Sequence, residues 1–236
     1  MSIQRSYAGH LVFLIALILV GCQRLPSDLT TTNQEVENQG TPKFEIVEVT
    51  IEDIQKAITT KQITATDIVH MYLERIKTYN GVCVNQPEGI LGPVSTIPNA
   101  GQINALMTLN LRPEHREEWG FDVGKARSMT DREDNDPDMP DALEVAAALD
   151  EEFARTGKLV GPLHGVVFGI KDQYDTFDMR TTLGMDAFYE NDRPPDDANV
   201  VKRLRDAGAI ILAKANLGEG GSQRSRSSFG GTLCNP

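Results

Sequence analysis

A lysine at the end of a short apolar segment is the residue of this 236-residue chain best suited to catalysis. Lys171 lies in residues 161–172, which read GPLHGVVFGIKD. Burial disfavours a charged ammonium and can lower the pKa of a lysine by as much as ~3–5 units, leaving an amine that accepts a proton. Asp172 need not cancel this effect, because neighbouring strand side chains point to opposite faces. The alternative is a solvent-exposed lysine at a strand end, paired with Asp172 or Asp175.

The sequence predicts no metal site and no cofactor. The four histidines are scattered, with no i, i+4 pair. Aspartates alternate in the acidic run of residues 131–141, as they do in a calcium loop, but Met139 stands where that loop needs glycine and Val145 where it needs glutamate. We therefore interpret the acidic run at residues 131–141, which ends the unusual region that starts at residue 112, as a solvated insertion. His164 is expected to pack or to form a hydrogen bond.

The N-terminus has the pattern of a secretion signal. Arg5 precedes an unbroken apolar run at residues 11–20, which is too short to span a bilayer. Leu-Val-Gly-Cys at residues 19–22 resembles a bacterial lipobox, so residues 1–21 are expected to be cleaved and Cys22 to carry lipid. Gln23 is not the aspartate associated with inner-membrane retention, which favours the outer membrane, facing the periplasm, in a Gram-negative cell. A plain cleaved signal and an uncleaved anchor are the alternatives.

Composition sets further limits. Residues 22–42 are polar and have almost no large apolar side chains, so they are expected to form a flexible tether. The formal net charge is -11, which argues against nucleic acid as a partner. Cys83 and Cys234 could pair in an oxidising compartment, but their spacing does not decide whether they do.

Capping and periodicity predict three helices. Thr50 with Asp53, and Thr64 with Asp67, form capping boxes. The second helix has one apolar stripe, and a third helix begins near Asp141 and stops at Gly157. The inward residues are expected to be Val69, Tyr72, Leu73 and Ile76 in the second helix, and Ala142, Ala146, Leu149 and Phe153 in the third.

Residues 80–101, after the second helix, are predicted to form a loop. A β-α-β unit follows the third helix. Residues 166–170 are expected to form a strand buried on both faces, and residues 209–213 another strand. Asp197 is expected to cap the helix between them, which ends at Gly208. Its expected inward residues are Val200, Val201, Leu204 and Ala207. This order predicts an α/β layered sheet.

Five segments in order resemble the amidase signature family over residues 161–236, about a third of the chain. They are GPLHGVVFGIKD, then TTLG at residues 181–184, then DDANVVKRLRDAGAIILAKANLGE, then FGG at residues 229–231, and CNP at residues 234–236. The helices at residues 50–80 resemble the family's N-terminal pair more loosely. The resemblance implies a layered α/β/α fold around a mixed sheet, with residues 43–236 as the N-terminal part of the domain. Val167 and Gln173 stand where the family often has other residues, but the family's lysine is present.

The resemblance also implies an amidase that hydrolyses a carboxylic amide, of a small molecule or peptide, through a Ser, cis-Ser, Lys triad. Lys171 stands at the position of the family's lysine. Both serines are expected in a Gly/Ser-rich signature beyond residue 236, so the chain alone is expected to be inactive. Gly221 and Ser222 are expected to contact substrate, the alternative being a flexible loop. Lys214, the family's second recurring lysine, is expected to be structural.

Two other functions stay open at this point. One is a non-catalytic lipoprotein with an amidase-like scaffold. The other is an amidotransferase A-type subunit, against which the secretion signal and the acidic charge both count. The serines at residues 225, 227 and 228 precede the Asn-Pro pair and are not expected to replace the triad serines.

Overall fold

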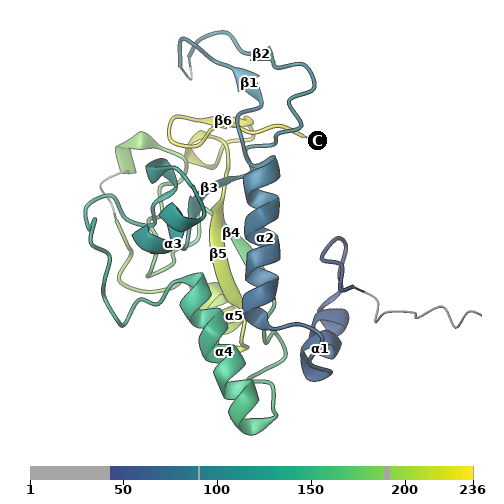
Figure 1. The fold of residues 1–236 in the computed structure, drawn as a ribbon. Helices are drawn as coiled ribbons and strands as arrows, with labels where there is room; N and C mark the ends of the chain where they lie inside the picture. The colour runs from purple at the N-terminus through teal and green to yellow at the C-terminus, as the bar shows by residue number, and fades with distance from the viewer. Residues whose placement is uncertain (1–42, 90, 189–191, 236) are drawn as a thin grey trace, which may run out of the picture. The chain divides into compact units, whose positions relative to one another are not determined.

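The computed structural model describes residues 43–89, 91–188 and 192–235 (Figure 1). The predicted signal, the lipidation site at Cys22 and the tether lie outside these residues. Within the described ranges, no helix combines the length and the apolar character needed to cross a membrane.

Two capped helices open the fold, as predicted. In α1 (Ile51–Thr59) the Thr50 hydroxyl accepts a hydrogen bond from the Asp53 amide at 3.1 Å. In α2 (Ala65–Tyr79) Thr64 and Asp67 make the same contact at 3.0 Å. Each box satisfies amides that the first helical turn leaves without partners. The sequence thus determines where both helices start.

A three-stranded mixed sheet lies at the centre (Figure 1). The strands are β3 (Leu106–Leu109), β4 (Val167–Lys171) and β5 (Ile210–Ala215), in the order β3-β5-β4. β4 runs parallel to β5, whereas β3 is antiparallel to it. Helix α5 (Asn199–Asp206) connects the two parallel strands, which completes the predicted β-α-β unit. The predicted mixed sheet is confirmed.

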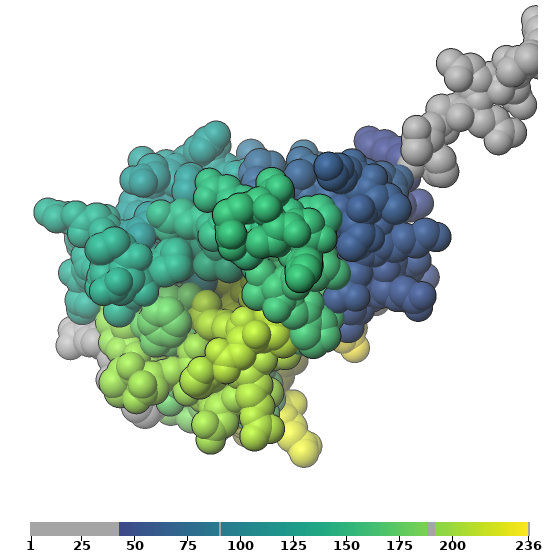
Figure 2. Space-filling view, turned by 90° about the horizontal axis from the view of Figure 1, so that it is seen from below, coloured from purple at the N-terminus to yellow at the C-terminus, as the bar shows by residue number. Residues whose placement is uncertain are grey.

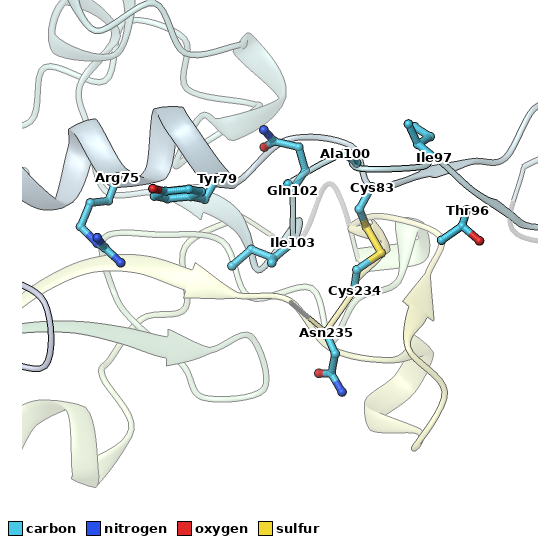
Figure 3. A pocket seen from close by; sticks show the side chains of 11 residues that line it. Arg75, Tyr79, Cys83, Thr96, Ile97, Ala100, Gln102, Ile103, Cys234 and Asn235 are labelled. Atoms are coloured by element: carbon cyan, nitrogen blue, oxygen red, sulfur yellow. A yellow bond between two sulfur atoms is a disulfide. The ribbon is translucent and has the colours of Figure 1, made fainter.

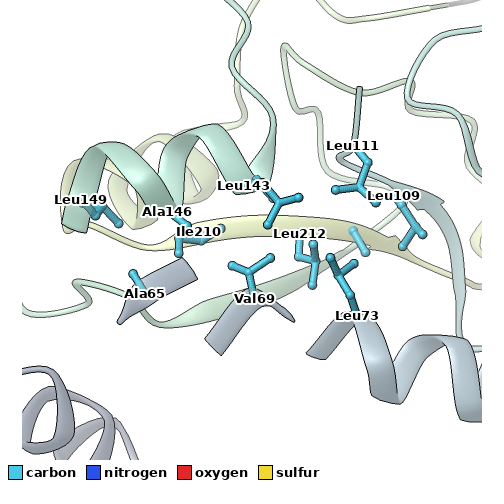
Figure 4. Close-up of a cluster of buried hydrophobic side chains, with 12 residues drawn as sticks. Ala65, Val69, Leu73, Leu109, Leu111, Leu143, Ala146, Leu149, Ile210 and Leu212 are labelled. Carbon is cyan, nitrogen blue, oxygen red and sulfur yellow. The ribbon is translucent and has the colours of Figure 1, made fainter. Parts of the chain in front are cut away.

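Helices cover both faces of the sheet. Ile210 and Leu212 of β5 pack against α2 and against α4 (Ala142–Thr156), as Figure 4 shows. Ile211, between them, packs with Val201 of α5. This alternation is the period of two expected of a strand. In Figure 2, the green α4 segment lies between the blue N-terminal helices and the yellow-green segment that contains α5.

Helix α4 also follows the prediction. Asp141 caps it, with its carboxylate accepting from the amides of Leu143 and Glu144 at 2.9 and 3.0 Å. Gly157 ends it at φ 67°, a left-handed conformation that glycine adopts with little strain.

Three predictions about the β-α-β unit were wrong. Asp197 does not cap α5, because its carboxylate accepts from the Phe177 amide and from Arg205 instead. Val200 is 47% exposed, since α5 turns Val201 toward the sheet. β4 is not fully buried on both faces, because Gly169 and Lys171, which share one face of the strand, are exposed.

The acidic run at residues 131–141 is not solvated throughout, so that prediction was wrong for Asp134 and Asp141, which are buried. Arg127 is fully buried and its Nε lies 2.5 Å from the Asp134 carboxylate. Asp134 also pairs with Arg193, which reaches Asp131 at 2.9 Å. Buried charges need partners, and of the two partners of Asp134, Arg127 is close in sequence whereas Arg193 lies 59 residues further on. The region folds around its ion pairs.

The predicted loop at residues 80–101 contains a small antiparallel pair, β1 (Val84–Asn85) with β2 (Ser95–Thr96). Cys83, beside it, is joined to Cys234 by a disulfide, which decides a pairing that the sequence left open. Figure 3 shows the bond at a cavity of about 580 Å³ that Tyr79 and Ile103 also line. The remaining elements are α3 (Pro113–Glu118), β6 (Arg226–Ser227), β7 (Gly231–Thr232) and the 3-10 turns Val123–Lys125, Asp186–Phe188 and Glu219–Gly221.

Candidate active site

Lys171 is the last residue of β4 and pairs with Ala215 of β5. Its side chain is exposed in the described part of the chain, as in the alternative of a lysine at a strand end. The two neighbouring side chains, Ile170 and Asp172, are the buried ones. As predicted, the side chains of Lys171 and Asp172 point to opposite faces of the strand, but the buried one of the two is Asp172. Lys171 forms no ion pair with Asp172 or Asp175 within the described ranges.

Asp172 anchors a turn next to Lys171. Its Oδ2 accepts from the Thr182 amide at 3.0 Å, from the Thr182 hydroxyl at 2.6 Å and from the Gly184 amide at 3.2 Å. Leu183, between them, has φ 56°, a conformation that costs a residue with a side chain about 1–3 kcal/mol. The contacts to one carboxylate hold the turn in this strained shape.

Lys214 of β5 is fully buried. Its amine contacts both ends of the segment from Tyr174 to Thr181, which leads into the turn that Asp172 holds. Its amine donates to the Tyr174 carbonyl at 2.7 Å and to the Thr181 hydroxyl at 2.8 Å, and it lies 3.6 Å from Asp172 Oδ1. Burial lowers the pKa of Lys214, and nearby carboxylates, that of Asp172 first, oppose the shift. These are the contacts of a structural residue, as predicted.

His164 is buried, as predicted for a packing residue. Its Nδ1 accepts from the Val160 amide at 3.1 Å, and its ring lies 6.1 Å from that of Phe153. Burial lowers the pKa of His164, so the ring is held in its neutral form.

Gly221 and Ser222 lie at the end of the Glu219–Gly221 turn, and both are exposed. The Gly220 amide donates to the Leu183 carbonyl at 3.0 Å, which ties this segment to the turn that Asp172 holds. No hydrogen bond joins Lys171 to Gly221 or Ser222 among the residues described. The two predicted parts of the site are connected through Asp172 and residues 182–184.

The serines upstream of Asn235 have other partners. Ser227 is buried, and its hydroxyl accepts from the Gly230 amide at 2.9 Å. The Ser228 hydroxyl donates to Glu219 Oε1 at 2.8 Å. Neither hydroxyl forms a hydrogen bond with a lysine within the described ranges.

Acidic and histidine side chains do not gather into a metal site in the described part of the chain. Asp134, one of the aspartates with alternate spacing, is instead paired with Arg127 and Arg193. Sequence reasoning missed the pairing of Asp172 with Lys214. The only local signal was an aspartate directly after the lysine of the apolar strand, and its partner lies 42 residues further on.

Comparison with known proteins places this geometry in a family. Residues 133–236 match the Amidase family model. A Schizosaccharomyces pombe protein named as an amidase is 31% identical over 179 residues, 75% of this chain and 22% of its own length. The A-type subunit of glutamyl-tRNA(Gln) amidotransferase from Alkaliphilus metalliredigens is 33% identical over 176 residues, 75% of this chain and 26% of its own length.

A solved structure agrees with the sequence relatives. A peptide amidase bound to the competitive inhibitor chymostatin gives a TM-score of 0.56 at 30% identity, covering 81% of this chain and 31% of that one. The fold is thus that of amidase-signature enzymes. The predicted resemblance to the amidase signature family is confirmed over residues 133–236, and the chain spans about a fifth to a third of the length of these relatives.

Proposed function

We propose that this chain is part of a hydrolase that cleaves the C–N bond of a carboxylic amide, with Lys171 as the base of a Ser, cis-Ser, Lys triad. The contrast between two lysines on neighbouring strands carries the proposal. Lys214 is buried and held by Tyr174, Thr181 and Asp172, so it has no freedom to reach a substrate. Lys171 ends the adjacent strand with an exposed side chain.

The chemistry follows from what a serine hydroxyl needs. It is a weak nucleophile until a base is in reach, and positioned proton transfer contributes typically about 10²–10⁴ in rate. In the proposed enzyme, the Lys171 amine takes a proton through a bridging serine while the second serine attacks the carbonyl carbon. Backbone amides would stabilise the oxyanion, each typically by about 2.7–4 kcal/mol. We place both serines in the Gly/Ser-rich signature that follows Asn-Pro in the family.

A neutral lysine amine requires that water be kept away from it. The exposed amine of Lys171 would therefore have to be covered when the catalytic site is complete. The proposed covering elements include the serine-bearing segment, because that segment must approach within hydrogen-bond distance of the amine.

The substrate is proposed to be a small-molecule or peptide amide that contacts Gly221 and Ser222. The likeness to a peptide amidase over 81% of this chain supports this class of substrate. The segment carrying both residues is exposed and is fixed to the turn beside Lys171 through the contact of Gly220 with Leu183.

We further propose that the protein is secreted and held at the cell envelope by lipid on Cys22, at the outer membrane if the cell is Gram-negative. The Cys83–Cys234 bond supports an oxidising compartment, where disulfides persist. Labelling of cells with an alkyne fatty acid would test it: label should be incorporated into the wild-type chain and be absent from Cys22→Ser.

An amidotransferase A-type subunit is the second candidate. The 33% identity to a subunit of this type over 75% of this chain favours it, whereas the disulfide argues against a cytosolic role. A non-catalytic lipoprotein with the same scaffold is the third.

Ammonia release by the product of the longest reading frame that contains this sequence separates these functions. Turnover of peptide amides by that product alone supports the amidase. Activity that appears only with added partner subunits supports an amidotransferase, and none under either condition supports the binding protein. The chain of residues 23–236 should be inactive, and measurable turnover by it would contradict the placement of the serines.

A further inference from the structure

Two arginines face one small cavity beside the proposed substrate segment. The cavity has a volume of about 300 Å³ and is lined by Leu91, Glu219, Arg224 and Arg226. The chain as a whole carries a net charge of -11, so a pocket with two guanidinium groups contrasts with the overall charge of the protein. Such a pocket favours an anionic ligand.

Glu219 does not neutralise these arginines by pairing with them. Its Oε1 accepts from the Ser228 hydroxyl at 2.8 Å, and its Oε2 accepts from the Ser228 amide. Arg226 makes one long hydrogen bond, to the Gly92 carbonyl at 3.3 Å. The Arg224 side chain has no ion pair or hydrogen bond in the described part of the chain. Most of the N–H groups of the two guanidiniums thus remain able to donate to a ligand.

The backbone fixes Arg224 beside Glu219. A Cβ atom at Gly218 would lie 2.0 Å from the Arg224 carbonyl oxygen and 2.5 Å from that of Ser222. A side chain at position 218 would clash, so the chain can fold back over itself there because the residue is glycine. Arg224 is therefore brought to the pocket by a tight loop.

The pocket adjoins the segment proposed to contact substrate. Glu219 begins the turn that ends at Gly221, and Ser222 follows directly. Gly220 contacts Leu183, whose turn is held by Asp172 next to Lys171. The pocket is therefore linked to the segment beside Lys171 through the Gly220–Leu183 contact and the turn that Asp172 holds.

We propose that Arg224 and Arg226 bind a carboxylate group of the substrate, so that the preferred substrates are amides of small dicarboxylic acids or of acidic peptides. The planar fork of a guanidinium matches a carboxylate with two parallel hydrogen bonds. Leu91, which is 96% exposed, offers an apolar contact to the methylene groups of such a ligand. The substrate class rests on the proposed function, whereas the carboxylate site does not.

Calorimetric titration of the full chain tests the site directly. Glutarate is the probe, and glutaramide is the neutral control of the same length. Glutarate should bind at least about fivefold more tightly, and Arg224→Gln and Arg226→Gln should each weaken it by at least about fivefold. Arg203→Gln removes the same charge from an exposed site on α5 and should change the affinity less than about twofold.

Several outcomes would overturn the site. They are no binding of glutarate, equal binding of glutaramide, or an equal loss in the Arg203→Gln variant, which would indicate net charge alone. Tighter binding of inorganic phosphate would overturn the carboxylate assignment. Thermal unfolding of each variant identifies any that fails to fold, and Arg224→Lys, which keeps the charge without the fork, then serves as the second variant and should bind more weakly than wild type.

The site and the proposed function can fail separately. If glutarate binds as expected but the complete protein hydrolyses no amide, the amidase proposal fails and the site stands. If the complete protein hydrolyses neutral amides as well as glutaramate, and Arg224→Gln leaves the ratio of the two kcat/KM values unchanged, the substrate class is refuted while the amidase stands.

Discussion

The Cys83–Cys234 disulfide should be a large single contributor to the stability of this chain. It closes a loop whose ends are 151 residues apart, and the conformational entropy that a cross-link removes from the unfolded chain grows with the logarithm of the loop length. For this separation the loop-entropy relation gives about 5 kcal/mol at 25 °C. The bond joins the segment after α2 to the segment that follows the β6–β7 pair, and Cys83 is only 3% exposed.

The perturbation is the double variant Cys83→Ala/Cys234→Ala. Urea unfolding followed by circular dichroism should show its midpoint about 2.5 M below that of the oxidised wild type, for a urea dependence of ~2 kcal/mol per M. Reduced wild type is the matched control, and it should unfold at the same midpoint as the double variant in reductant. Identical midpoints for oxidised and reduced wild type would contradict this expectation, because closing the loop would then have no effect on the unfolded chain.

Three further changes probe buried groups of the fold. Asp172→Ala leaves a buried ammonium without its carboxylate and should cost about 3–5 kcal/mol in urea unfolding, whereas Asp175→Ala, at an exposed site, should cost less than about 0.5; equal losses would contradict the stabilising role of the Asp172–Lys214 pair. Burial lowers the pKa of His164, so the unfolded state binds more protons and the free energy of unfolding should fall as the pH drops below ~6.5, with a shallower fall in His164→Gln. A variant with the wild-type pH dependence would exclude this residue as the cause. Val201→Ala should destabilise by about 2 kcal/mol and Val200→Ala by less than about 0.5, since they are 0% and 47% exposed; the reverse order would mean that α5 is turned the other way.

Features set by local sequence could be predicted, and they included most of the helices. The capping boxes at Thr50 and Thr64 depend on residues three positions apart, and the Asp141 cap and the Gly157 stop of α4 are equally local. The apolar runs of β4 and β5 indicated buried strands, and their separation by one helix indicated a parallel pair. These signals do not need knowledge of distant contacts.

Features decided by distant partners were missed. Asp197 has the right position for a cap, but Arg205 and the Phe177 amide bind its carboxylate. The aspartates of residues 131–138 look solvated in sequence because Arg193, one of their partners, lies far along the chain. An apolar run also does not say which face of its last residues is covered, so the burial of Asp172 in place of Lys171 could not be read from it.

The role of Lys171 is tested most directly by the rate of amide hydrolysis by the product of the longest reading frame containing this chain, with Lys171 replaced by alanine. We expect a loss of at least about 10²-fold in kcat, because the hydroxyls lose their base. Lys158→Ala, at an exposed position away from the site, should keep the wild-type rate. A Lys171→Ala enzyme that hydrolyses the same amide as fast as the Lys158→Ala enzyme would contradict the assignment of Lys171 as the base.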